Sequence, residues 1–171
     1  MAQQCAADNS DHVRFLVRLV ELELIDRERR LVERRIRTAR FPTTKTLDAF
    51  DFLIIPSVNK PLVMDLARGG FIDRHENVIA VGNSGTGKTH LALGIGLAAC
   101  QRGYRVLWKS AAMLVNELVE ARDSKQLLRL QKTPLNVQLL IIDELGFVPL
   151  SKTGAELLFE LISQRYEPGP R

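Results

Sequence analysis

The sequence predicts an α/β protein built on a parallel sheet with flanking helices. From residue 77 onward, short apolar runs alternate with longer segments of helical period. A loop with three glycines joins the first apolar run to a helix, and an acidic pair ends the third run. Ligands of α/β proteins bind at the carboxyl ends of parallel strands, which is where these two polar features fall.

The composition is typical of a globular domain with an appendage. The chain has 171 residues, of which 46% are hydrophobic and 26% charged, and its net charge is +4. The two cysteines, Cys5 and Cys100, have neither metal-ligand spacing nor the pattern of a disulfide framework. The first residues do not resemble a secretory signal, and no apolar run is long enough to span a bilayer. We therefore expect a cytoplasmic protein without membrane association.

The sequence of the N-terminal part, residues 1–76, predicts a tail, a helix and a linker. Residues 1–11 are small and polar, and we expect them to be disordered. Apolar residues then recur at helical spacing, which predicts a basic helix within residues 12–42 that ends before Pro42. Residues 43–76 show no clear period except for a short helix near 61–68, so they are interpreted as a linker.

Residues 77–171 predict the α/β domain itself. Three runs have the length and composition of strands, and the third is apolar enough for burial on both faces. These strands are expected at 77–81, 104–110 and 137–144. The segments between and after them have helical patterns, and Ser110 is positioned to cap one of them. The helices are expected at 88–102, 111–122, 125–132 and 153–167.

The loop after the first strand matches the pattern G-x-x-x-x-G-K-[ST]. Glycines let the backbone approach a ligand closely, and the N–H groups of the loop and of the following helix then point at phosphate oxygens. The lysine would reach the β- and γ-phosphates, and the threonine hydroxyl would ligate Mg²⁺. The predicted nucleotide-binding residues are Gly82, Asn83, Ser84, Gly85, Thr86, Gly87, Lys88 and Thr89.

An acidic pair, Asp143 and Glu144, follows the third strand. Asp143 is expected to hold Mg²⁺ together with Thr89, and Glu144 to orient and activate the attacking water as a general base. A water-activating glutamate favours hydrolysis over transfer to a substrate hydroxyl. Without the phosphate loop, the same pair would be interpreted as two carboxylates that end a strand.

The basic charge is concentrated in residues 27–40, where seven arginines stand against two glutamates. The arginines spread around much of the helix and are candidates for contacts to the DNA backbone, which would depend on salt rather than sequence. The predicted DNA-binding residues are Arg27, Arg30, Arg34, Arg35 and Arg37. The alternative is a solvated helix with internal ion pairs.

Three segments together resemble a known family. They are "GNSGTGKTHLALGIGLAACQRGYRV", "LLIIDELGFVPLSKTGAELLFELISQRYE" and "RRLVERRIRTARFPTTKTLDAFDF". Over residues 13–167 the chain resembles the IstB-like ATPases that assist insertion-sequence transposition, which are related to DnaC-type helicase loaders within the AAA+ superfamily. Phe147 stands where this family is expected to have a tyrosine.

The resemblance implies a fold and a function. The fold would be a P-loop NTPase of AAA+ type, with the phosphate loop as Walker A and the acidic pair as Walker B. Phe50, Asp51 and Phe52 would match the segment that leads into the ATPase core. The cofactors would be ATP and Mg²⁺. The partners would be duplex DNA, the transposase of the same insertion sequence, and further copies of the chain in a ring or helical oligomer.

The chain departs from the family after Glu167. Family members continue into a strand that lies between the Walker A and Walker B strands, and then into arginines that read the γ-phosphate. We therefore expect a C-terminally truncated member with an incomplete sheet and impaired ATP hydrolysis. Two alternatives remain open: a DnaC-like helicase loader, and a nucleotide- and DNA-binding remnant that does not hydrolyse ATP.

Overall fold

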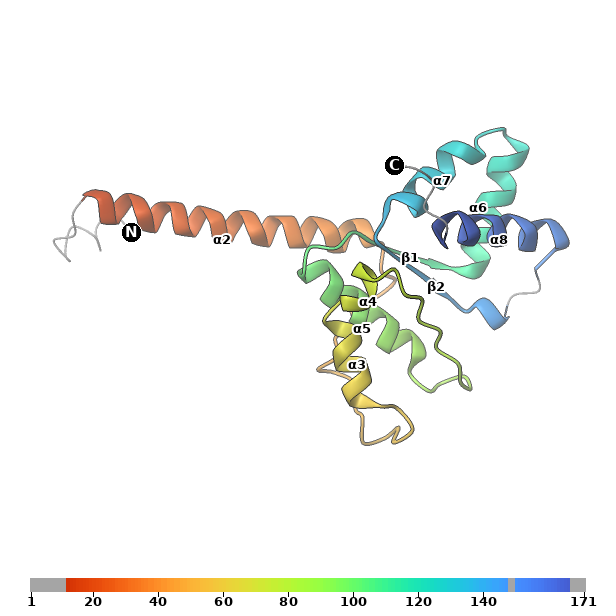
Figure 1. Ribbon diagram of the computed structural model, residues 1–171, viewed down its shortest axis with the longest axis horizontal. Helices are drawn as coiled ribbons and strands as arrows, with labels where there is room; N and C mark the ends of the chain where they lie inside the picture. The colour runs from red at the N-terminus through yellow and green to blue at the C-terminus, as the bar shows by residue number, and fades with distance from the viewer. Residues whose placement is uncertain (1–11, 148–149, 167–171) are drawn as a thin grey trace. The chain divides into compact units, whose positions relative to one another are not determined.

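The structure is a computed structural model that describes residues 12–147 and 150–166. The chain forms two compact units, residues 1–34 and residues 35–171 (Figure 1). The predicted tail at residues 1–11 lies outside the described residues. None of the helices that the structure describes is long and apolar enough to cross a membrane.

Helix α2, His12–Ala39, confirms the predicted basic helix. It ends at Arg40, whose φ of 58° is left-handed and breaks the helical hydrogen-bond pattern before Pro42. The last turns bury one face, on which Ile36 and Ala39 join a hydrophobic core. By contrast, the large apolar residues between Val13 and Ile25 are exposed, except for the half-buried Phe15.

The second unit contains a parallel pair of strands, β1 (Val106–Ser110) and β2 (Leu139–Asp143). Their register aligns Val106 with Leu139 and Ser110 with Asp143. The connection runs through α6 (Ala111–Asp123) and α7 (Leu127–Asn136). The Ser110 hydroxyl accepts the N–H of Met113 at 3.3 Å, which confirms the predicted cap of α6.

Helices cover both faces of this sheet (Figure 1). One side carries α3 (Lys60–Ala67), α4 (Gly70–Asp73) and α5 (Lys88–Gln101), and its core includes Val106 of β1. Cys100 is fully buried there, and this burial raises the pKa of its thiol to about 11. The other side carries α6 and α8 (Lys152–Tyr166), whose leucines pack with Ile142 of β2.

The residues before α3 were interpreted as a linker, and the structure shows that they pack against α5. A Cβ added at Gly94 would lie 2.6 Å from the Leu47 side chain. A Cβ added at Gly96 would lie 3.0 Å from the Phe41 ring and 2.7 Å from Ile141. Glycines at these helical positions therefore let the preceding segment on one side, and strand β2 on the other, approach the helix backbone closely.

Two strand predictions were wrong in part. Residues 77–81 form no strand, and Val78, Ile79 and Val81 are exposed, because no described strand lies beside them to complete a hydrogen-bonded ladder. Strand β2 does form, but its residues are half-buried rather than buried on both faces. With only β1 beside it among the described strands, its other edge lacks the neighbour that full burial requires.

Candidate nucleotide-binding site

The glycine-rich loop leads directly into α5, as predicted. Gly85 and Gly87 both have a φ of 78°, a left-handed conformation that favours glycine. Gly87 is the N-cap residue of α5, so the loop lies at the positive end of the helix dipole. A Cβ added at Gly85 would meet nothing within 4 Å, which leaves the tip of the loop open to a ligand. This arrangement is suited to an anion.

The Lys88 ammonium folds back over the loop. Its Nζ donates to the carbonyl oxygens of Gly82 at 2.7 Å and Asn83 at 2.6 Å. Thr86 also donates from its hydroxyl to the Asn83 carbonyl, at 2.8 Å. The cation is thus held at the mouth of the loop by neutral carbonyl groups. An incoming phosphate would compete for it as a stronger, charged acceptor.

The structure also brings together Thr89 and Asp143, the two residues predicted to hold Mg²⁺. The Thr89 hydroxyl donates to Asp143 Oδ1 at 3.2 Å, although the two residues are 54 positions apart. A hydroxyl and a carboxylate oxygen are ligands that Mg²⁺ accepts, and this cation usually keeps further sites for water and phosphate. The residues therefore fit a magnesium site of the kind that binds with a nucleotide. Among the described residues, no cluster of three or more histidine, cysteine, aspartate or glutamate side chains could hold a metal.

Glu144 has an unusual backbone conformation. Its φ is 60°, and its N–H donates to Asp143 Oδ1 at 3.0 Å. A non-glycine residue in this region is strained, and such strain clusters at functional sites. This turn ends β2, and Glu144 is exposed. Its neighbour Asp143 contacts Thr89 in the first turn of α5, so Glu144 lies near the glycine-rich loop. The placement is compatible with the predicted role as a base toward water.

The sequence did not predict one contact that supports the glycine-rich loop, which is made by Phe50. A Cβ added at Gly87 would lie 2.5 Å from the Phe50 ring, so this ring packs directly on the loop backbone. Phe50 also meets the His90 ring edge-on at 5.2 Å between centroids. His90 Nε2 lies 2.8 Å from the carbonyl oxygen of Thr46, which requires the proton on Nε2. Only the family match of the Phe50 segment hinted at this cluster.

The predicted arginines divide into two groups on α2. Arg27, Arg30, Arg34 and Arg37 recur at intervals of three and four residues, so they share one exposed face, narrower than the spread expected from the sequence. Arg35 lies on the half-buried face, near Gly103 and Cys100. Arg30 donates to Glu23 at 2.6 Å, and the Arg29–Glu33 ion pair spans 3.6 Å. The four-arginine face is the candidate anion-binding surface of this helix.

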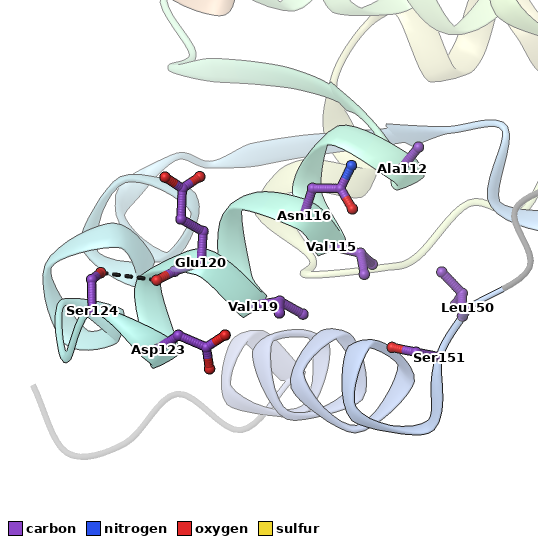
Figure 2. A pocket seen from close by; sticks show the side chains of 9 residues that line it. All are labelled: Ala112, Val115, Asn116, Val119, Glu120, Asp123, Ser124, Leu150 and Ser151. Atoms are coloured by element: carbon purple, nitrogen blue, oxygen red, sulfur yellow. Dashed lines mark hydrogen bonds between the residues drawn. The ribbon is translucent and has the colours of Figure 1, made fainter.

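A separate hollow of about 820 Å³ lies between α6 and the two residues that precede α8, Leu150 and Ser151 (Figure 2). Val115, Val119 and Leu150 form its apolar wall, and Glu120 and Asp123 lie at one end. The Ser124 hydroxyl at that end donates to the Glu120 carbonyl at 2.9 Å. No residue of the glycine-rich loop and neither member of the acidic pair lines it, so this hollow is distinct from the nucleotide site.

The fold and the site together define a class. The structure of AMPPCP-bound DnaA from Aquifex aeolicus matches with a TM-score of 0.55 and 24% identity, covering 74% of this chain and 39% of that one. This similarity supports the fold alone. The chain therefore has the α/β fold of this structure, and its glycine-rich loop, Lys88, Thr89 and Asp143 form a P-loop site within it.

The sequence comparisons give the family. Residues 1–170 match the family described as IstB-like ATP binding protein, and the chain belongs to this family. A protein described as the ATP-binding protein of insertion sequence IS5376 from Geobacillus stearothermophilus is 38% identical over 99% of this chain and 68% of its own length. The corresponding protein of IS21 from Pseudomonas aeruginosa is 36% identical over 98% of this chain and 63% of its own. This chain thus spans about two thirds of these relatives.

The Phe50 contact predicts that this ring holds the loop in place. Phe50→Leu should leave the fold intact but raise amide hydrogen exchange in residues 82–90 by about fivefold or more, because the loop loses its packing partner. Leu53→Ala is the matched control, since Leu53 lies in the same segment and is 91% exposed. Equal exchange in both variants and the unsubstituted chain would contradict a supporting role for Phe50. Hydrogen exchange with mass spectrometry measures the effect.

Proposed function

We propose that this chain binds ATP with Mg²⁺ and serves the transposition of an insertion sequence. The observation that carries the proposal is the contact between Thr89, in the first turn after the glycine-rich loop, and Asp143, at the carboxyl end of β2. This contact places a carboxylate from β2 next to the phosphate loop at the start of α5. A cation bound with a nucleotide is held by both the phosphates and such a carboxylate. The names of the family and of its relatives support ATP as the nucleotide and an insertion sequence as the context.

Each residue of the site has a role in this proposal. The loop from Gly82 to Thr89 surrounds the phosphates with backbone N–H groups, and Lys88 leaves the carbonyls of Gly82 and Asn83 to pair with the β- and γ-phosphates. Thr89 and Asp143 hold Mg²⁺, with Asp143 acting directly or through water. The bound cation supplies charge that offsets the phosphates and the developing charge of the leaving group. Glu144 orients water for attack and accepts its proton.

The arginine face of α2 supports the proposed partner. Four guanidinium groups on one exposed helix face can contact successive phosphates of duplex DNA without reading its sequence. Arg35 contributes less directly, because it lies on the half-buried side. We further propose that the DNA-bound chain engages the transposase of its insertion sequence, acts in the cytoplasm, and assembles into a ring or helical oligomer. The helicase-loader alternative differs in its protein partner, and a pull-down with a transposase and a replicative helicase separates the two.

Lys88→Ala should weaken ATP binding by about tenfold or more, because the charge-assisted hydrogen bonds to phosphate are lost. The measurement is a fluorescence or calorimetric titration with ATP and Mg²⁺. Lys60→Ala is the matched control, since Lys60 lies outside the loop with its Nζ 5.3 Å from the Phe52 ring centroid. Unchanged affinity in the Lys88 variant would rule out the loop as the phosphate site.

Glu144→Gln should retain ATP binding but slow single-turnover hydrolysis by about 100-fold or more, since the amide cannot accept a proton from water. The isosteric change keeps the size of the side chain. A quench-flow experiment with radiolabelled ATP measures the rate. Equal rates in both proteins would show that Glu144 is not the base, and absence of turnover in the unsubstituted chain would favour the non-hydrolysing alternative.

DNA binding should weaken steeply with salt, with a slope of log K against log salt of about −3 to −4 for four phosphate contacts. Arg27→Gln should reduce the magnitude of this slope by about one. Arg29→Gln is the matched control, because Arg29 points from another face of α2 and pairs with Glu33. Fluorescence anisotropy with a duplex of arbitrary sequence measures the slope. A flat salt dependence would contradict the assignment of the arginine face.

A further inference from the structure

A second cavity, of about 400 Å³, lies against the face of β1 that is opposite the α3–α5 side. Val106 packs into the core of that side, and side chains alternate along a strand, so Leu107 and Lys109 point to the other face. Residues of α6 and α7 form most of the remaining lining. All lining residues fall between Arg40 and Pro134 and outside the nucleotide site, and the volume suits a small molecule.

Lys109 brings a buried positive charge to this cavity. The residue is 5% exposed, and its ammonium donates to Glu117 Oε1 of α6. An ammonium has three N–H donors, and this carboxylate oxygen is the one acceptor that the described residues offer it. A buried charge is costly unless it is paired and its hydrogen bonds are made. An anion in the cavity would supply a further acceptor.

Two exposed arginines, Arg40 and Arg129, also line the cavity. Arg40 follows the last residue of α2, and Arg129 belongs to α7. Within residues 12–147 and 150–166, neither guanidinium group forms a hydrogen bond or an ion pair. A guanidinium group binds the oxygens of a carboxylate or a phosphate through two parallel hydrogen bonds. Both arginines are therefore able to bind such a group.

The charges of the lining favour an anion. Three cations, Arg40, Lys109 and Arg129, stand against the two carboxylates of Glu117 and Glu120, a formal sum of 3 − 2 = +1. Glu117 is already paired with Lys109, so Glu120 is the carboxylate that remains for two arginines. In Figure 2 the Glu120 side chain points away from the apolar wall of the other hollow, whose lining it shares. A ligand with a negative group would balance the excess of positive charge.

The burial of Lys109 also indicates the size of the ligand. A nucleic acid duplex could contact the two exposed arginines, but it is too wide to enter a cavity of about 400 Å³ and reach the ammonium. A small molecule can do both. Leu107 and Leu130 add apolar surface to the lining, which would contact the carbon skeleton of an organic ligand.

We propose that this cavity binds a small organic anion through a carboxylate or a phosphate group. The group pairs with the guanidinium groups of Arg40 and Arg129, and Lys109 donates to it from the buried side. The bound anion connects the residue after α2 with β1 and α7. The site shares no residue with the nucleotide site and needs no ATP, so failure of either proposal leaves the other untouched.

Heteronuclear NMR of the backbone amides of the full chain tests the site. The probes are inorganic phosphate and succinate, each compared with sodium chloride at equal ionic strength. Amides of residues 107–109 and 124–133 should shift saturably, with a dissociation constant of about 5 mM or below for at least one probe. Amides of residues 82–90 report binding at the phosphate loop separately. Saturation by one probe alone identifies the charged group, and absence of saturable shifts in residues 107–133 with both probes overturns the proposal.

Two exposed substitutions on α7 test the location of the anion. Arg129→Gln should raise the dissociation constant by about tenfold, because a charge-assisted pair of hydrogen bonds is lost. Lys132→Gln is the matched control, since Lys132 is exposed on the same helix but does not line the cavity, and it should change the constant by less than about twofold. Equal effects of the two variants would assign the binding to the general charge of α7 and overturn the site.

A paired substitution tests the buried part of the cavity. Lys109→Met together with Glu117→Gln removes both charges at similar size, so that neither group is left buried and unpaired. This variant should bind the probe about tenfold more weakly. Unchanged affinity in a folded double variant would mean that the anion contacts the exposed arginines alone, and it would overturn the cavity as the site. If the double variant does not fold, the comparison of the Arg129 and Lys132 variants decides.

Discussion

The site depends on the close approach of α5 to β2, which brings a threonine hydroxyl within 3.2 Å of an aspartate carboxylate. Gly96 makes this approach possible, because a Cβ there would lie 2.7 Å from Ile141. Thr89 and Gly96 are seven residues apart on α5 and share a face, while Ile141 and Asp143 are two residues apart on β2 and share a face. The packing contact in the core therefore also sets the distance at the site.

A second layer of packing holds the other side of α5. Leu47 lies over Gly94 and Phe50 over Gly87, so the segment before the domain covers the same helix whose first turn forms the site. His90 joins this segment through the Thr46 carbonyl. The phosphate loop is thus placed between a strand on one side and an irregular segment on the other. Side chains fill the space between α5 and β2 and between α5 and the irregular segment. A substitution in either contact is therefore expected to shift the backbone of the phosphate loop.

The sequence predicted what depends on local chemistry. The phosphate loop, the acidic pair, the cap at Ser110 and α2 all rest on residue types at fixed spacing, and each has the expected place in the structure. What it could not predict depends on distant neighbours. Residues 77–81 have the composition of a strand, but a strand exists only beside another, and none of the described ones pairs with them. The Phe50 cluster likewise lies in a segment without period, where no local signal marks a partner.

Helix α2 illustrates how one element can carry two surfaces. Its period is continuous from His12 to Ala39, but the composition changes near Arg27 from apolar with mixed charge to strongly basic. In the basic half, the face of Arg27, Arg30, Arg34 and Arg37 lies opposite the half-buried face of Leu31, Val32, Arg35 and Ile36. Like charges at i, i+4 destabilise a helix unless an anion or a packed face offsets them. Ala39 is buried in the core and Ile36 packs against it, and this packing supplies part of that offset while the four arginines stay exposed.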